Sequence, residues 1–246
     1  MSQYRQSPFA NITPVVKNLL IINIIFAIAE LILRNRFDME GVLGIYYFNS
    51  PKFNLWQIIS YMFMHAPVDR EPQHLLFNMF GLFMFGPILE TALGSKKFLN
   101  FYLICGIGAI VFQWIVQAYE VYHIAGSITI PYPATDQGYF QYGGGEKAAQ
   151  TLYDVYNGSV VGASGAIFGI LVAFATIFPN MELMLFFIPI PIKAKYVISF
   201  YVLLELYESV SQAPGDHVAH LAHIGGAILG FLMVKIWGIR RMDNFY

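Results

Sequence analysis

Charged residues are scarce in this chain. Asp, Glu, Lys and Arg make up 12% of its 246 residues and hydrophobic residues make up 57%, whereas a soluble domain has about 25% charged and about 45–50% apolar residues. This composition argues against an ordinary soluble domain and indicates a lipid bilayer as the surrounding medium. The formal net charge of -1 gives no electrostatic reason for a nucleic acid partner, and we expect none.

Cysteine is nearly absent as well. The one cysteine, Cys105, cannot form an internal disulfide. It lies in an apolar run over residues 101–116, so we expect it to be a small buried hydrophobic group. The chain shows neither an internal repeat nor a coiled-coil heptad pattern, which argues against a solenoid or an extended coiled coil.

Long hydrophobic runs are abundant. A helix needs about 20 mainly apolar residues to cross an apolar core about 30 Å thick. Six segments meet this requirement, at approximately residues 15–34, 74–94, 97–119, 160–178, 192–209 and 217–237. We therefore predict an all-α, polytopic membrane protein with a bundle of six transmembrane helices, forming a single membrane domain over residues 1–246.

Two connections between these segments are long. The aromatic-rich segment 37–64 has few charges and suits a first loop, or short helices, lying in the membrane interface. The segment 120–158 contains prolines and three consecutive glycines among polar residues, which is typical of an extramembrane loop.

Basic residues favour one orientation, because cytoplasmic loops are enriched in Lys and Arg. With a cytoplasmic N-terminus, the short inside loops are the basic ones, and the outside basic residues are spread over two long connections. We therefore expect a multi-pass protein of a bacterial-type cytoplasmic membrane with both termini in the cytoplasm. The inside residues are Arg5, Lys17, Lys96, Lys97, Lys193, Lys195, Lys235, Arg240 and Arg241, and the outside residues are Arg34, Arg36, Lys52, Arg70 and Lys147.

Polar side chains inside spanning helices are costly, so each is a candidate functional group. His74 and Asn78 open the second predicted helix with i, i+4 spacing, Ser164 opens the fourth, and His223 lies in the sixth. At about 1.5 Å per residue from the inner helix ends, Ser164, Asn78 and His223 share one layer. This layer lies about 6–12 Å beneath the outer face of the apolar core.

Such a layer suits hydrolysis by a serine nucleophile. Irregular backbone at membrane depth must be buried in protein or reached by water, so we expect a water-accessible cavity down to Ser164. Neutral imidazole is the usual base for a hydroxyl nucleophile, and His223 could fill that role. If Ser164 starts its helix, free backbone N–H groups and the side chains of Asn78 and His74 could stabilise an oxyanion.

Glycines flank the candidate residues. Gly162 and Gly165 permit a tight turn and a close approach by another helix or a substrate. Gly226 and Gly230 give the sixth predicted helix a face of small residues for close packing. Because His223 lies one turn away on this face, close packing could bring it against Ser164.

Other interpretations of these residues stay open. The Gly-x-Ser-Gly motif alone is common at ordinary membrane-helix interfaces, and the polar pair of the second helix could be interhelical hydrogen-bonding groups. His217, His220 and His223 could also bind a metal, since histidine is the commonest metal ligand. Their i, i+3, i+6 spacing rotates the outer pair by about 240°, so a straight helix cannot direct all three at one ion. We expect neither a metal nor a cofactor.

Three glutamates lie in the second and fifth predicted helices. Glu205 and Glu208 are near the outer end of the fifth predicted helix, where contact with water is a sufficient explanation and no catalytic role is assigned. Glu90 is near the inner end of the second predicted helix, too far from the polar layer for catalysis, and we expect a structural hydrogen bond.

Taken together, these residues resemble the rhomboid family of intramembrane serine proteases, over about residues 56–237. Each motif alone is unspecific, but their order along the chain and the helices on which they fall are specific. The motifs are His74-x-x-x-Asn78, Gly86-x-x-x-Glu90-x-x-x-Gly94, Gly162-x-Ser164-Gly165 and Ala222-His223-x-Gly225-Gly226.

The resemblance implies a serine–histidine dyad without an acidic third member. This dyad would cut the transmembrane segment of another membrane protein in the lipid bilayer. Ser164 would be the nucleophile and His223 its base. The oxyanion hole would consist of His74, Asn78 and the Ser164 backbone N–H. Structural support would come from Gly162, Gly165, Phe168 and Gly226.

The chain departs from the family pattern in places. Gln57 follows Trp56 where many members have arginine, and Phe168 stands where a tyrosine can stack on the catalytic histidine. The segment between His65 and His74 looks longer than usual, and the loop over residues 120–158 looks expanded. Two alternative functions remain: a non-proteolytic rhomboid-like binder of membrane helices, and a transporter. The presence of both Ser164 and His223 argues against the binder, and the one-sided position of the polar layer argues against the transporter.

Overall fold

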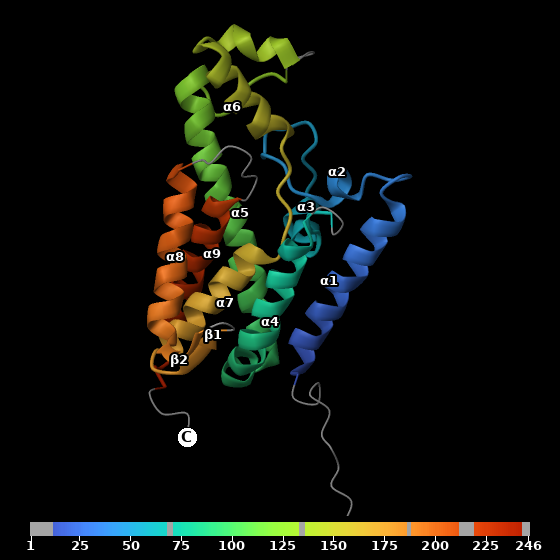
Figure 1. Ribbon diagram of the computed structural model, residues 1–246. Helices are drawn as coiled ribbons and strands as arrows, with labels where there is room; N and C mark the ends of the chain where they lie inside the picture. The colour runs from blue at the N-terminus through green and yellow to red at the C-terminus, as the bar shows by residue number, and fades with distance from the viewer. Residues whose placement is uncertain (1–11, 68–70, 133–135, 186–187, 212–218, 243–246) are drawn as a thin grey trace, which may run out of the picture.

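The fold is a bundle of α-helices, as Figure 1 shows for this computed structural model. The structure describes residues 12–67, 71–132, 136–185, 188–211 and 219–242. The elements are α1 (Pro14–Leu33), α2 (Met39–Leu43), α3 (Gln57–Ser60), η2 (Tyr61–Phe63), α4 (Pro72–Leu93), α5 (Ser95–Ala125), η3 (Asp136–Tyr142), α6 (Gly145–Asn157), α7 (Ser164–Ile177), β1 (Glu182–Leu185), β2 (Ile188–Lys193), α8 (Ala194–Ser211) and α9 (His220–Ile236).

Six of the described helices, α1, α4, α5, α7, α8 and α9, correspond to the six predicted spans. Helix α7 packs against α4, α5, α8 and α9, while α1 packs against α4 and α5. In the described part of the chain, α1, α4 and α5 are long and apolar enough to cross a membrane, and α7 and α9 are apolar but shorter. The all-α, polytopic membrane fold class is confirmed.

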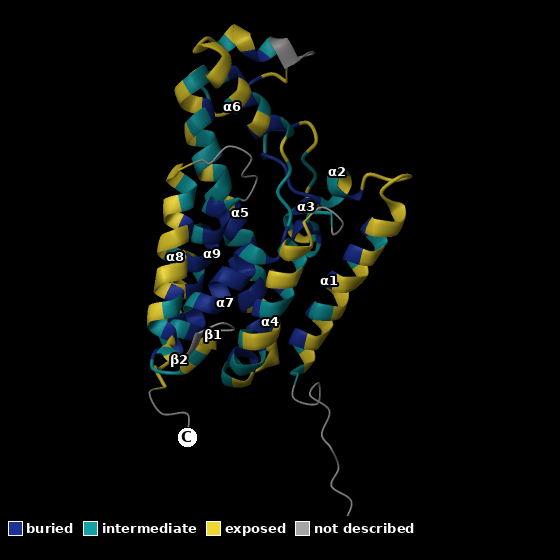
Figure 2. Cartoon of the chain, in the orientation of Figure 1, coloured by how far each residue is buried: buried dark blue, intermediate teal, exposed yellow. Residues whose placement is uncertain are grey.

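The outer faces of the bundle are apolar. On α1, the buried residues recur every three or four positions, and large aliphatic side chains are exposed between them (Figure 2). Helix α8 likewise exposes Phe200, Leu203, Tyr207 and Val210. Soluble monomers rarely expose apolar patches of this extent. The exposed faces therefore fit contact with lipid, and the buried stripes fit contact with neighbouring helices.

The centre of the bundle depends on a close approach between α7 and α9. A Cβ atom added to Gly226 would overlap the carbonyl oxygen of Gly165, and one added to Gly230 would lie 2.6 Å from the Cα of Gly169. Two pairs of glycines therefore let the helix backbones touch along two turns. This contact is the small-residue packing expected for a membrane helix pair.

Glu90 anchors the start of α1. Its carboxylate accepts hydrogen bonds from the backbone N–H groups of Val15 (3.1 Å) and Val16 (2.9 Å), and from the hydroxyl of Ser95 (2.6 Å). The first N–H groups of a helix have no partner within it. Glu90 supplies that partner from α4, which is the structural role expected from the sequence.

The first loop is held together by backbone-directed hydrogen bonds. Gln57 is buried, and its side-chain amide donates to the carbonyls of Val42 (3.3 Å) and Lys52 (3.1 Å) and accepts from Asn54 N–H (3.0 Å). The indole of Trp56 donates to the same Val42 carbonyl at 3.0 Å. Gln57 thus forms neutral hydrogen bonds at the position where many rhomboid-family members have a charged arginine.

Several boundaries differ from the prediction. Helix α5 continues to Ala125 and ends at Gly126, whose φ of 73° is left-handed. The predicted extramembrane loop therefore contains the end of α5, η3 and α6, and these pack around a second small core that includes Tyr47, Tyr139 and Tyr156. The antiparallel pair β1–β2, with Leu183 opposite Ile192, was not predicted.

The starts of α7 and α9 also differ. Helix α7 begins at Ser164, four residues later than predicted, because Gly162 has a φ of 131° that a helix cannot accommodate. Helix α9 begins at His220, and His217 lies outside the described residues, as do Arg5 and Arg70 of the predicted charge pattern. The single membrane domain over residues 1–246 stays a prediction.

Substituting Gly230 by alanine should destabilise the protein by about 1–3 kcal/mol, the usual cost of overpacking a tight contact. The new methyl group would meet backbone atoms of Gly169, which cannot move without shifting α7. Thermal unfolding in detergent measures the effect. The control is Ile228→Ala on the exposed face of α9, and equal stability of Gly230→Ala and wild type would contradict the proposed contact.

Candidate functional site

Ser164 is the first residue of α7. The preceding chain is extended, since Val160 and Ile45 exchange backbone hydrogen bonds of 2.8 and 3.0 Å, and Gly162 N–H donates to the Tyr61 carbonyl at 2.9 Å. The positive φ of Gly162 then turns the chain into the helix. Ser164 therefore stands at a helix N-terminus, where free N–H groups and the helix dipole favour negative charge.

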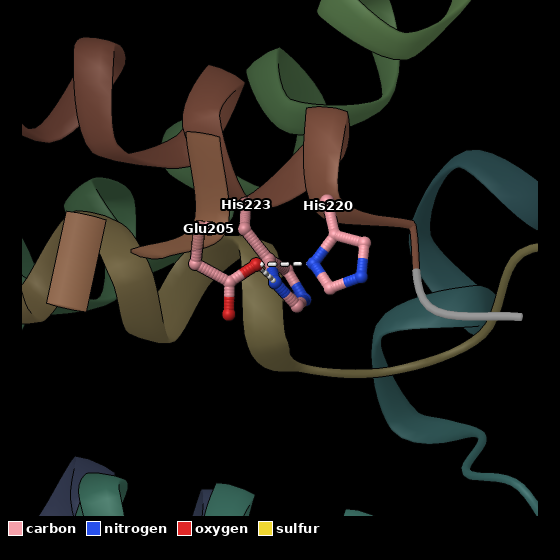
Figure 3. A group of neighbouring side chains, drawn as sticks. All are labelled: Glu205, His220 and His223. Atoms are coloured by element: carbon pink, nitrogen blue, oxygen red, sulfur yellow. Dashed lines mark hydrogen bonds and ion pairs between the residues drawn. The ribbon is translucent and has the colours of Figure 1, made fainter. Parts of the chain in front are cut away.

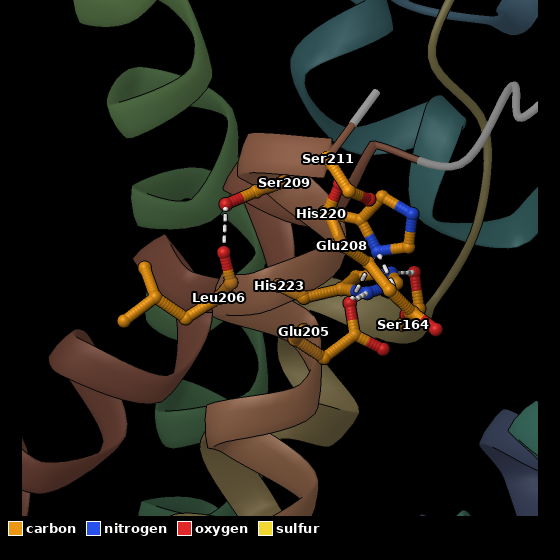
Figure 4. A network of polar contacts seen from close by, with 8 residues as sticks. All are labelled: Ser164, Glu205, Leu206, Glu208, Ser209, Ser211, His220 and His223. Atoms are coloured by element: carbon orange, nitrogen blue, oxygen red, sulfur yellow. Dashed lines mark hydrogen bonds and ion pairs between the residues drawn. The ribbon is translucent and has the colours of Figure 1, made fainter. Parts of the chain in front are cut away.

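His223 contacts this serine from α9. Its Nε2 lies 2.7 Å from the Ser164 Oγ, across 59 positions of sequence (Figure 4). The Phe168 ring stacks on the imidazole with centroids 4.5 Å apart and an interplanar angle of 10°. The ring of His223 is thereby fixed from one face while one of its nitrogens points at the hydroxyl.

A carboxylate contacts the other side of the same imidazole. The Oε2 atom of Glu205, on α8, lies 2.7 Å from the Nδ1 of His223 and 2.7 Å from the Nδ1 of His220. Figure 3 shows dashed lines that run from one carboxylate oxygen to both rings. Glu205 is only 4% exposed, so the interpretation that it reaches water was wrong. The rotation of α8 directs it into the bundle.

Glu208 differs from Glu205 although it is on the same helix. Its side chain is 39% exposed, and its Oε2 lies 3.6 Å from the Nδ1 of His220. This exposure is compatible with the expected contact with water, which stays a prediction for this residue. Glu208 therefore lies on the exposed side of α8, and Glu205 lies on the side that faces the bundle.

His74 approaches Ser164 from α4. Its Nδ1 accepts a hydrogen bond of 3.3 Å from Ala66 N–H, so its proton is on Nε2. A side chain at Gly162 would place its Cβ 2.9 Å from this Nε2 and 3.4 Å from the Ser164 Oγ. The missing side chain of Gly162 thus leaves a space that borders both a donor and the hydroxyl.

Two neighbours complete this side of the site. Asn78 is buried, and its Nδ2 donates to the His74 carbonyl one turn earlier at 2.8 Å; the amide carries a second hydrogen. The ring of His65 packs edge-on against that of His74 at 5.4 Å. Burial, and secondarily the nearby His74, lower the pKa of His65 to about 3, so His65 adds no charge here near neutral pH.

Among the described residues, Glu205, His220 and His223 could also hold a metal ion. One ligand atom from each of Glu205, His220 and His223 lies within 4.8 Å of the others. Both ring nitrogens, however, already lie at hydrogen-bond distance from a single carboxylate oxygen. This geometry is that of one acceptor shared by two donors, and the expectation of no metal stays a prediction.

Comparisons with known proteins agree with the fold. The family model described as the Rhomboid domain matches residues 52–131 and 137–240. Rhomboid protein 1, mitochondrial, of Saccharomyces cerevisiae is 28% identical over 176 residues, covering 71% of this chain and 40% of the relative. Rhomboid protease AarA of Providencia stuartii is 29% identical over 188 residues, covering 72% and 54%.

A plant relative matches more of the chain. RHOMBOID-like protein 12, mitochondrial, of Arabidopsis thaliana is 28% identical over 233 residues, which covers 85% of this chain and 60% of the relative. The chain thus spans about half the length of the curated relatives it matches. Because the family model covers most of the chain, this membrane-helix bundle belongs to the rhomboid family.

Proposed function

We propose that this protein is an intramembrane serine endopeptidase that hydrolyses peptide bonds in or near the transmembrane segments of other membrane proteins. The observation that carries the proposal is the 2.7 Å contact between the Ser164 Oγ and the His223 Nε2. Membership in a family that includes a relative named a rhomboid protease supports it. Ser164 is the proposed nucleophile and His223 the proposed base.

The reaction would follow the usual steps of acyl transfer to a serine. The Ser164 Oγ attacks the carbonyl carbon of the scissile peptide while the His223 Nε2 takes the hydroxyl proton. The same proton passes to the leaving amine, and an acyl-enzyme forms. A water molecule then loses a proton to His223 and attacks the ester. His223 returns this proton to the Ser164 Oγ as the second product leaves.

The oxyanion formed during attack would be stabilised at the space beside Gly162. The proposed donors are the Ser164 backbone N–H, the Nε2–H of His74 and the amide of Asn78. Donors that point to the position of the developing charge contribute most when they are fixed in advance. His74 is fixed in this way by its bond from Ala66.

The proposed partners follow from this chemistry. The substrate is a transmembrane segment of another protein, the bilayer is the medium, and nucleic acid plays no part. We also retain the proposed orientation in a bacterial-type cytoplasmic membrane, with both termini in the cytoplasm and the start of α7 toward the outside.

Substituting Ser164 or His223 by alanine should lower turnover by about 10⁴-fold or more, as removal of a nucleophile or its base does in other serine proteases. Purified protein in detergent or lipid is incubated with a set of fluorescently labelled single-span transmembrane peptides, and cleavage is followed by electrophoresis. Ser209→Ala serves as the matched control, because this half-buried serine hydrogen-bonds only the nearby Leu206 carbonyl at 2.8 Å among the contacts described. Equal cleavage by wild type and Ser164→Ala would refute the function.

The choice of base is tested with the neighbouring histidine. His220→Ala should retain turnover well above that of His223→Ala, since the Nε2 of His223 contacts the hydroxyl. The opposite order of the two variants would show that the assignment of the base is wrong.

Asn78→Ala should lower kcat by about 10²–10³-fold, the usual effect of removing one oxyanion donor. The substitution also removes the hydrogen bond to the His74 carbonyl, so thermal unfolding is measured in parallel. An unchanged kcat in a folded variant would exclude Asn78 from the oxyanion hole.

Gly162→Ala should also lower kcat by about 10²-fold or more, because its methyl group would occupy the space beside the His74 Nε2 and block an oxyanion donor. Backbone strain is controlled with Gly126→Ala, since Gly126 has a φ of 73° and nothing within 4 Å of an added Cβ. Similar kcat values for the two variants would argue against an oxyanion space at Gly162.

A further inference from the structure

Glu205 is a buried carboxylate in an unusual position for an ionisable group on a membrane helix. It is 4% exposed, and its Oε2 lies 2.7 Å from the Nδ1 atoms of both His220 and His223. Burying a carboxylate is strongly unfavourable unless hydrogen bonds replace its hydration. Two ring N–H groups from α9 supply that replacement, so the carboxylate and the histidines stabilise one another.

The contact with Glu205 determines which nitrogen of His223 carries the proton. A carboxylate oxygen accepts hydrogen bonds, so the Nδ1 of His223 must be the donor. A neutral imidazole has one N–H, and the Nε2 that faces the Ser164 Oγ at 2.7 Å is then the unprotonated acceptor. This is the tautomer that a general base requires.

The surroundings of His223 leave Glu205 as the carboxylate in direct contact with it among the described residues. Ser164 and Phe168 face the imidazole from α7, and His220 neighbours it on α9. Glu208 of α8 contacts His220 at 3.6 Å instead. A positive charge that develops on His223 during attack would therefore be compensated directly by Glu205.

We infer that Glu205 is the positioning residue of His223, so that the reactive group of this protein is a Ser164–His223–Glu205 triad. This inference rests on the proposed function and deepens it, because the resemblance of the sequence implied a dyad without an acidic member. His220 holds the same carboxylate oxygen with a second N–H and so fixes it beside His223.

The test uses a rhodamine-labelled fluorophosphonate, which reports on the activated serine without a known substrate. The Ser164 Oγ forms a bond to phosphorus, the P–F bond breaks, fluoride leaves, and His223 takes the hydroxyl proton. Glu205→Gln should lower the maximal labelling rate by about 10²–10⁴-fold, as loss of the triad carboxylate does. Half-saturation by the probe should stay near the wild-type concentration.

The labelling rates of two Glu205 variants show whether the charge or the length of this side chain matters. Glutamine keeps the length of the side chain and aspartate keeps its charge, so Glu205→Asp should be labelled faster than Glu205→Gln. A purely structural role gives the reverse order and would overturn the inference. The matched control, Glu208→Gln, should label within about fivefold of wild type, because Glu208 is partly exposed and lies 3.6 Å from His220 without contacting His223 among the contacts described.

Spectra of the unmodified protein keep the inference testable if the Glu205 variants do not fold. The chain has six histidines. NMR spectra of ¹⁵N-histidine-labelled protein report which ring nitrogen is protonated, and the signals missing from the His223→Gln spectrum are those of His223. We expect the proton on Nδ1 of His223, and a proton on Nε2 overturns the inference. Failure of the proposed function has a different signature, since Ser164→Ala would then be labelled as fast as wild type.

Discussion

The contact between α7 and α9 is the constraint on which the candidate site depends. Gly165 and Gly169 face Gly226 and Gly230 with no side chain between the backbones. At this distance, Ser164 at the start of one helix and His223 one turn before the glycines of the other come within hydrogen-bond reach. Larger residues would separate the helices and break that contact. The glycines therefore determine the geometry of the candidate site, although none of them has a side chain to contribute.

The polar groups of the bundle are arranged by the cost of burial. Backbone and side-chain groups in an apolar medium must find partners within the protein. Glu90 finds them in the N–H groups at the start of α1, and Glu205 finds them in two imidazoles. The same requirement thus produces a structural anchor near one end of the bundle and a candidate catalytic group near the other.

The sequence predicted much of the fold because long apolar runs report helices directly. It placed the six helices within a few residues at most ends, but it missed the continuation of α5 to Ala125 and the pair β1–β2, which depend on local backbone geometry and pairing. The importance of Glu205 was also missed. Its position near a helix end suggested contact with water, and sequence alone does not give the rotation of α8. The shared contact of Glu205 with two histidines exists only after α8 packs against α9.

The candidate site is therefore assembled from two sides of a central helix. Helix α4 brings His74 and Asn78 to the side where an oxyanion would form, and α8 and α9 bring the carboxylate and the imidazole to the side where the proton would go. Helix α7 packs against all three, and its first residue is Ser164. A nucleophile at this point can meet both groups without bending any helix, because the turn at Gly162 ends the extended chain just before it. The short length of α7 suits the same arrangement, since in a helix that began earlier the backbone N–H of Ser164 would be hydrogen-bonded within the helix.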